Sequence, residues 1–182
     1  GVPSYQLYKR YTSVGSTRFK DRIIKRPMAS PALLRNGAAV TYGAGAGQIA
    51  VDTTTGIVTF VADASANVTA VAVGTTTNVT LASTLAGLAV GGRLWLQGLT
   101  GVNASLLNGM SHAITAIAGA VYTLSTNTAS AGITATGQGV KLPQPTDTLT
   151  WSGGFYVPVN FMSDEIDWTL ESGGVYASRL VS

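Results

Sequence analysis

The sequence predicts an all-β protein in which a β-sandwich-like domain is interrupted by a small inserted β-barrel or sandwich module. Short segments rich in Val, Ile, Thr and aromatic residues recur along the 182 residues, and Gly, Pro, Asn and Ser separate them. No long stretch carries the apolar periodicity of a helix. Because 46% of the residues are hydrophobic, the chain can form a buried core.

The first predicted elements are two strands that a turn connects. Residues 5–11 alternate between two faces, as a strand does, and residues 14–17 supply a turn. Residues 18–26 contain too few apolar positions for an amphipathic helix, so we expect a second strand there. Pro27 and Pro31 end it, because proline cannot donate a hydrogen bond to a sheet.

Two hairpin signals follow. Residues 32–35 precede Asn36-Gly37, a pair that is typical of a tight hairpin turn. Further on, strands at 49–51 and 57–60 flank Asp52-Thr53-Thr54-Thr55-Gly56, in which Asp opens the turn and Gly takes a positive φ at its exit.

Residues 63–140 form the predicted insert. From about residue 61 to residue 140 only Asp63 and Arg93 are charged, yet β-branched residues are abundant, so we expect this stretch to fold. A compact domain rarely contains so long a loop, and strand character resumes at 149–161. The outer domain therefore comprises residues 1–62 and 141–182. Residues 85–88 are expected to form one helical turn, and the predicted strands of the insert are 71–73, 78–81, 93–97, 112–117, 120–124 and 133–136.

Composition excludes several functions. The chain has no cysteine, so it contains no disulfide, thiolate nucleophile or Cys-based zinc site. No apolar run is long enough to span a membrane, and we expect neither a membrane partner nor a cofactor. The sequence begins at Gly1 without a signal peptide pattern, and we expect it to be a fragment of a longer chain.

The charges are separated along the chain, although the net charge is only +3. A basic segment often binds nucleic acid, but basic and acidic ends can also meet in a head-to-tail interface between copies. The second interpretation accounts for both ends, so we expect no specific nucleic-acid ligand. The candidate interface residues are Lys9, Arg10, Arg22, Lys25 and Arg26 against Asp164, Glu165, Asp167 and Glu171.

Several further candidate sites have simpler structural explanations. Residues 43–47 are glycine-rich but precede a strand, whereas a phosphate-binding loop precedes a helix. His112 has no acid near it in sequence and is expected to be a packed strand residue. The carboxylates at 164–167 could bind a cation or act on a glycosidic bond, but a solvated strand face explains them. Trp95 and Tyr122 are candidate glycan contacts, because aromatic rings can stack on sugars.

Five outer stretches carry a family resemblance: Tyr5-Gln-Leu-Tyr-Lys-Arg-Tyr11, Arg22-Ile-Ile-Lys-Arg-Pro27, Val51-Asp-Thr-Thr-Thr-Gly-Ile-Val-Thr-Phe60, Leu149-Thr-Trp-Ser-Gly-Gly-Phe-Tyr-Val-Pro-Val-Asn-Phe161 and Asp167-Trp-Thr-Leu-Glu171. Together they resemble the phage distal tail protein family, which also includes the distal tail protein of gene transfer agents. They cover roughly half of the chain, in the family's order. The insert is similar to the FCCH domain, a small β module of ubiquitin-activating enzymes, at residues 79–81, 91–98, 107–110 and 121–124.

The resemblance implies a structural virion protein without enzymatic activity. It implies a homo-oligomeric ring, hexameric in this family, that connects the tail tube protein to the tail hub and baseplate. The protein would be made in the host cytoplasm and located at the phage tail tip. A second possible function is a carbohydrate- or receptor-binding module of that tip. A glycoside hydrolase fits less well, because the sequence contains only one acidic cluster.

Overall fold

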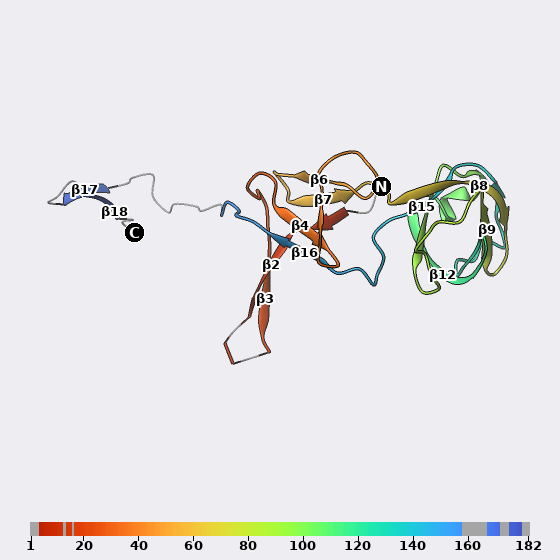
Figure 1. Cartoon of the computed structure of the whole chain (residues 1–182), viewed down its shortest axis with the longest axis horizontal. Coiled ribbons are helices and arrows are strands. Elements are labelled where there is room, and N and C mark those ends of the chain that lie inside the picture. The colour runs from red at the N-terminus through yellow and green to blue at the C-terminus, as the bar shows by residue number, and fades with distance from the viewer. Residues whose placement is uncertain (1–3, 13, 16, 158–166, 172–174, 180–182) are drawn as a thin grey trace.

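The computed structural model describes residues 4–12, 14–15, 17–157, 167–171 and 175–179, and the side chains of β17 and β18 lie outside the description. Apart from the short 3-10 helix η1 (Ala104–Leu106), the regular elements in these residues are β-strands. The all-β class predicted from the sequence is confirmed. Figure 1 shows a closed barrel beside a group of smaller sheets, with the hairpin of β2 and β3 projecting from that group.

Two three-stranded sheets make up the sandwich-like part. In one, β1 (Ser4–Gln6) and β6 (Ile49–Asp52) lie on either side of β7 (Ile57–Phe60). In the other, β5 (Ala38–Val40) and β16 (Leu149–Ser152) lie on either side of β4 (Ala32–Arg35). Pairing of β16 with β4 thus joins segments that the barrel separates in sequence. The sheets share a core that includes Leu7, Ile24, Leu33, Ile49, Val58 and Phe60.

Both predicted hairpin turns are confirmed. Asn36 and Gly37 adopt φ of 53° and 81° between the paired strands β4 and β5. Between β6 and β7, the Asp52 carboxylate accepts hydrogen bonds from Thr54 N at 2.7 Å and Thr55 Oγ1 at 2.7 Å. The hydrogen bonds of Asp52 and the positive φ of Asn36 and Gly37 are local features, which explains why the two turns could be predicted from sequence.

Residues 5–11 do not form the single strand that the alternation predicted. Leu7 is buried between β1 and β2 (Tyr8–Thr12), where its N–H donates to Gly56 O and its carbonyl accepts from Ile24 N. Beyond this break, β2 pairs with β3 (Phe19–Ile23) in a separate two-stranded hairpin. A tertiary hydrogen bond therefore redirects the chain from one sheet into another.

The barrel is closed in the order β10-β12-β13-β9-β8-β15. β9 alternates between buried and more exposed residues, so one of its faces contributes to the interior. β10 and β15 instead bury adjacent residues, because Trp95 and Val140 belong to the core cluster of the sandwich. The core includes Val68, Val79, Leu81, Leu94, Leu96, Ile114, Tyr122 and Leu124. The six strands are β8 (Ala64–Ala72), β9 (Thr77–Leu81), β10 (Arg93–Gln97), β12 (Met110–Ala118), β13 (Val121–Leu124) and β15 (Gln138–Lys141).

Smaller elements complete the chain. β11 (Thr100–Val102) pairs with β14 (Gly132–Thr134) beside the barrel, and β17 (Asp167–Glu171) pairs with β18 (Val175–Arg179). The helical turn predicted at 85–88 is only a hydrogen-bonded turn, closed by Leu88 N and Leu85 O at 3.3 Å. The strand predicted at 149–161 ends at Ser152, and its residues 158–161 lie outside the described part of the chain.

The barrel contacts the sandwich through apolar side chains. Trp95, Val140 and Leu142, at one end of the barrel, belong to the same buried cluster as the sandwich core. The barrel strands begin at Ala64 and end at Lys141, and the division into two folding units stays a prediction.

Candidate interface

The β2–β3 hairpin carries much of the basic segment, and its residues are exposed. Lys9 lies opposite Arg22 and Tyr11 opposite Lys20 in the strand register. Because side chains alternate along a strand, these four share one face, which we call the basic face. The second face, which we call the aromatic face, consists of Tyr8, Arg10, Thr12, Phe19, Asp21 and Ile23.

The aromatic face is organised by an ion pair. The Arg10 guanidinium donates two hydrogen bonds to the Asp21 carboxylate, each at 2.7 Å. The guanidinium carbon also lies 3.9 Å from the centre of the Phe19 ring. The hydrogen bond from Arg10 holds the pKa of Asp21 below its ordinary value. Asp21 therefore neutralises one of the cations that the sequence predicted to meet a neighbouring subunit.

The basic face keeps its positive charge. Lys9 Nζ lies 5.7 Å and the Arg22 guanidinium carbon 5.9 Å from the centre of the Phe155 ring. Within the part of the chain whose side chains are described, no carboxylate forms a salt bridge with Lys9, Lys20 or Arg22. This face can therefore bind an acidic surface without first breaking an internal ion pair.

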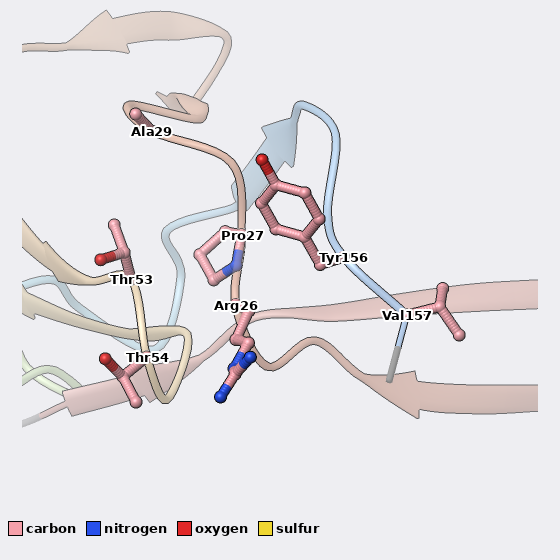
Figure 2. Close-up of a pocket in the computed structure, with 7 residues that line it drawn as sticks. All are labelled: Arg26, Pro27, Ala29, Thr53, Thr54, Tyr156 and Val157. Atoms are coloured by element: carbon pink, nitrogen blue, oxygen red, sulfur yellow. The ribbon is translucent and has the colours of Figure 1, made fainter. Parts of the chain in front are cut away.

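Arg26 lies beyond the end of β3, so the five predicted cations do not share one face of the hairpin. Its backbone, with φ of 56°, bonds to Thr54 O at 3.3 Å and to Tyr156 N at 3.0 Å. The side chain lines an open pocket of about 580 Å³ (Figure 2). Lys25 is exposed, beyond the end of β3. The remaining residues around the pocket are Pro27, Ala29, Thr53, Thr54, Tyr156 and Val157.

The acidic half of the predicted interface lies only partly within the described residues. Asp164 and Glu165 lie outside the described residues. Asp167 and Glu171 are the first and last residues of β17, where the backbone alone is described. Their pairing with the basic face therefore stays a prediction.

The burial of Trp95 and Tyr122 argues against the predicted glycan contact. Tyr122 is 1% exposed, and its hydroxyl accepts a hydrogen bond from Leu85 N at 2.8 Å. Trp95 is 9% exposed and lines, together with Arg93 and Leu142, a pocket of about 440 Å³ between barrel and sandwich. Tyr122 therefore presents no open ring face on which a sugar could stack, and Trp95 contributes only a small exposed area to this pocket.

His112 is a packed residue, in agreement with its structural interpretation. Its Nε2 lies 2.9 Å from Leu107 O and its Nδ1 lies 2.7 Å from Thr126 Oγ1. Since a carbonyl only accepts, Nε2–H donates and Nδ1 accepts from the threonine hydroxyl. Burial lowers the pKa of His112, while the Leu107 carbonyl raises it and the charge of Arg93 lowers it further.

The glycine-rich loop at 43–47 lacks the geometry of a phosphate-binding loop. The residues after it form strand β6, and Gln48 Oε1 accepts from Gly45 N at 2.6 Å within the loop. No three His, Cys, Asp or Glu side chains among the described residues are placed to hold a metal ion. The described part of the chain contains no helix with the length and apolar character needed to cross a membrane.

An ion-pair network at the junction of barrel and sandwich was not predicted from the sequence. Arg35 in β4 forms salt bridges with Asp63 at 2.7 Å and with Asp147 at 2.6 Å. Asp63 immediately precedes β8, and Asp147 lies between β15 and β16. The available signal was the isolation of Asp63, one of two charged residues between about residues 61 and 140.

No protein-family model, curated protein or solved structure matches the chain.

Proposed function

We propose that this protein is a structural subunit of a phage tail tip, a distal tail protein whose copies assemble into a hexameric ring. The ring joins the tail tube protein to the tail hub and baseplate, and the protein acts without enzymatic activity. The resemblance of the outer stretches to the distal tail family supports this proposal. The all-β fold, with a barrel placed between two sandwich segments, agrees with the architecture expected from that resemblance.

The observation that carries the proposal is the exposure of the β2–β3 hairpin. Tyr8 is 51%, Phe19 56% and Ile23 60% exposed, and all three belong to the aromatic face. Large apolar side chains grouped on a projecting element mark a protein interaction surface. The basic face, on the opposite side of the hairpin, adds an electrostatic preference for an acidic partner.

A second copy of the chain supplies such a partner. The acidic residues Asp164, Glu165, Asp167 and Glu171 are concentrated near the end of the sequence. In this contact the basic face of one copy meets the acidic residues of the next copy. The two surfaces are different parts of the chain, so the contact is head-to-tail. Repeated around an axis, head-to-tail contacts close into a ring.

The test is the assembly state of the purified full-length protein, measured by light scattering and negative-stain imaging at low and moderate salt. We expect closed rings that dissociate as salt screens the basic face. The double variant Lys9→Glu and Arg22→Glu should prevent ring formation. The control Ser65→Asp and Asn78→Asp adds negative charge at exposed barrel positions and should leave rings intact.

A monomeric wild-type protein under all conditions would overturn self-assembly into a ring. Rings of the charge-reversed variant that match the wild type in abundance and salt dependence would overturn the charged interface. A thermal denaturation curve of each variant establishes that the folded state is retained.

A further inference from the structure

The sandwich is open along one side, between β1 and β16. β1 is the outer strand of its sheet, and β16 is the outer strand of the other. Their free edges have no strand partner among the described residues. Beside the opening, Trp151 Nε1 on β16 donates at 2.8 Å to the carbonyl oxygen of Tyr8, the first residue of β2. Exposed edges of this kind can pair with another chain.

A groove follows this opening. A pocket of about 310 Å³ reaches the core side chains Leu33, Val58 and Phe60. A second pocket of about 440 Å³ shares Tyr8, Leu149, Thr150 and Trp151 with the first, so the two adjoin along β16. The groove thus combines an apolar floor with an unpaired strand edge.

One end of the groove is basic. Lys9 and Arg10 line the second pocket, together with Ser152 and Gly153 at the end of β16. Asp21 neutralises Arg10, whereas Lys9 forms no salt bridge with the side chains that the structure describes. An extended segment with apolar and acidic residues would therefore fit the groove in both shape and charge.

β17 is an extended segment of this kind. Its only strand partner among the described residues is β18, with which it forms a hairpin. β18 in turn pairs only with β17 among the described strands. An isolated two-stranded hairpin is at best marginally stable in water, so it needs a further surface to pack against. By sequence, β17 is Asp-Trp-Thr-Leu-Glu, with an acid at each end and apolar residues between them.

We propose that β17 of a second copy of this chain adds to the free edge of β16, beside the groove, and completes the sandwich. Backbone hydrogen bonds from β16 would provide affinity, and the groove and Lys9 would select the segment, as in other strand additions. This inference rests on the proposed ring and specifies its contact. Each copy donates β17 on one side and accepts a strand on the other, so the addition is head-to-tail.

Because the chain has no cysteine, an introduced cysteine supplies the only thiol with which a cross-linker can react. Thr150→Cys places a thiol on β16, and Thr169→Cys places one at the middle of β17. The two single-cysteine proteins are mixed, allowed to exchange subunits and treated with a short bismaleimide. Because each chain has one thiol, a Thr150 to Thr169 product can only join two chains. Asn78→Cys, at an exposed barrel position, replaces Thr150→Cys in the control mixture.

We expect at least about tenfold more mixed dimer with Thr150→Cys than with Asn78→Cys, because strand addition gives the two thiols a high effective concentration. An excess of a synthetic peptide of residues 165–173 should reduce both the cross-link and the rings of the unmodified protein. The competition against rings of the unmodified protein requires no substitution, so it does not depend on how a variant folds.

The outcomes separate the inference from the proposed function. Rings without the specific cross-link would overturn strand addition and leave the ring intact. A further variant carries both Thr150→Cys and Thr169→Cys in one chain. If it cross-links only within single chains, β17 adds to its own β16, and this result would also overturn the inference. A specific cross-link in a dimer that never forms rings would support strand addition and overturn the ring. Neither rings nor cross-link would overturn both.

Discussion

The Arg35 guanidinium and the Asp63 carboxylate face each other through two parallel hydrogen bonds of 2.7 and 2.8 Å. The same guanidinium binds Asp147 Oδ2 at 2.6 Å, so one side chain holds the segments that enter and leave the barrel. All three side chains are less than one fifth exposed, at 18%, 15% and 12%. This geometry fixes the barrel on the sandwich more firmly than exposed pairs could.

Replacement of Arg35 should therefore destabilise the protein. In Arg35→Leu, two shielded carboxylates lose their cation, and we expect a loss of about 2–4 kcal/mol in the free energy of unfolding. Urea denaturation followed by Trp fluorescence measures it. Arg10→Leu removes an exposed salt bridge and serves as the control, with a much smaller expected effect. Equal effects of the two substitutions would contradict the structural role of Arg35.

Removal of the Tyr122 hydroxyl should leave the Leu85 N–H unsatisfied. That hydrogen bond is buried in the barrel at 2.8 Å, so Tyr122→Phe is expected to cost about 1–3 kcal/mol of stability. The matched control is Tyr42→Phe, because Tyr42 also uses its hydroxyl, as a donor to Pro31 O, but is 40% exposed. Chemical denaturation of both variants provides the comparison. A Tyr122 variant as stable as the Tyr42 variant would refute the prediction.

Acidification should destabilise the barrel through His112. Burial lowers its pKa in the folded state, so the unfolded chain binds a proton more readily. The free energy of unfolding should therefore decrease as pH falls below about 6.5, the ordinary pKa of histidine. Denaturation curves between about pH 8 and about pH 5.5 measure this dependence while most carboxylates stay ionised. His112→Gln cannot titrate and should have a flatter profile.

Gly56 should tolerate alanine less well than Gly37. Both have positive φ, of 72° and 81°, which costs a non-glycine residue about 1–2 kcal/mol. At Gly56 an added Cβ would also lie only 1.9 Å from Ile24 O, whereas at Gly37 it would meet nothing within 4 Å. We expect Gly56→Ala to lower thermal stability clearly more than Gly37→Ala. Equal melting temperatures would show that the backbone around Ile24 yields without cost.

Sequence patterns predicted the local elements better than the site. Asp52 and Gly56 define a turn through contacts with near neighbours, and Asn36-Gly37 defines one through the positive φ of both residues. The alternation at 5–11 was wrong about the continuity of the strand, because the long-range hydrogen bond of Leu7 with Gly56 interrupts it. Trp95 and Tyr122 show a second limit, since strand alternation does not reveal whether a face is covered.

The cations illustrate what could be foreseen of the candidate interface. Their concentration in the first thirty-five residues is visible in the sequence. The register of β2 with β3, however, places Lys9 and Arg22 on one face and pairs Arg10 with Asp21 on the other. Arg26 lies apart from both faces, beside Thr54 and Tyr156.

The all-β class, the turns and the separation of charge could be predicted without a structure, because they depend on backbone propensity and on near neighbours. The meeting of Arg35 with Asp63 and Asp147, residues 28 and 112 positions away, became visible only in the folded chain. The same holds for the groove between β1 and β16. Such features depend on which surfaces pack together, and packing joins segments whose separation along the chain carries no local signal.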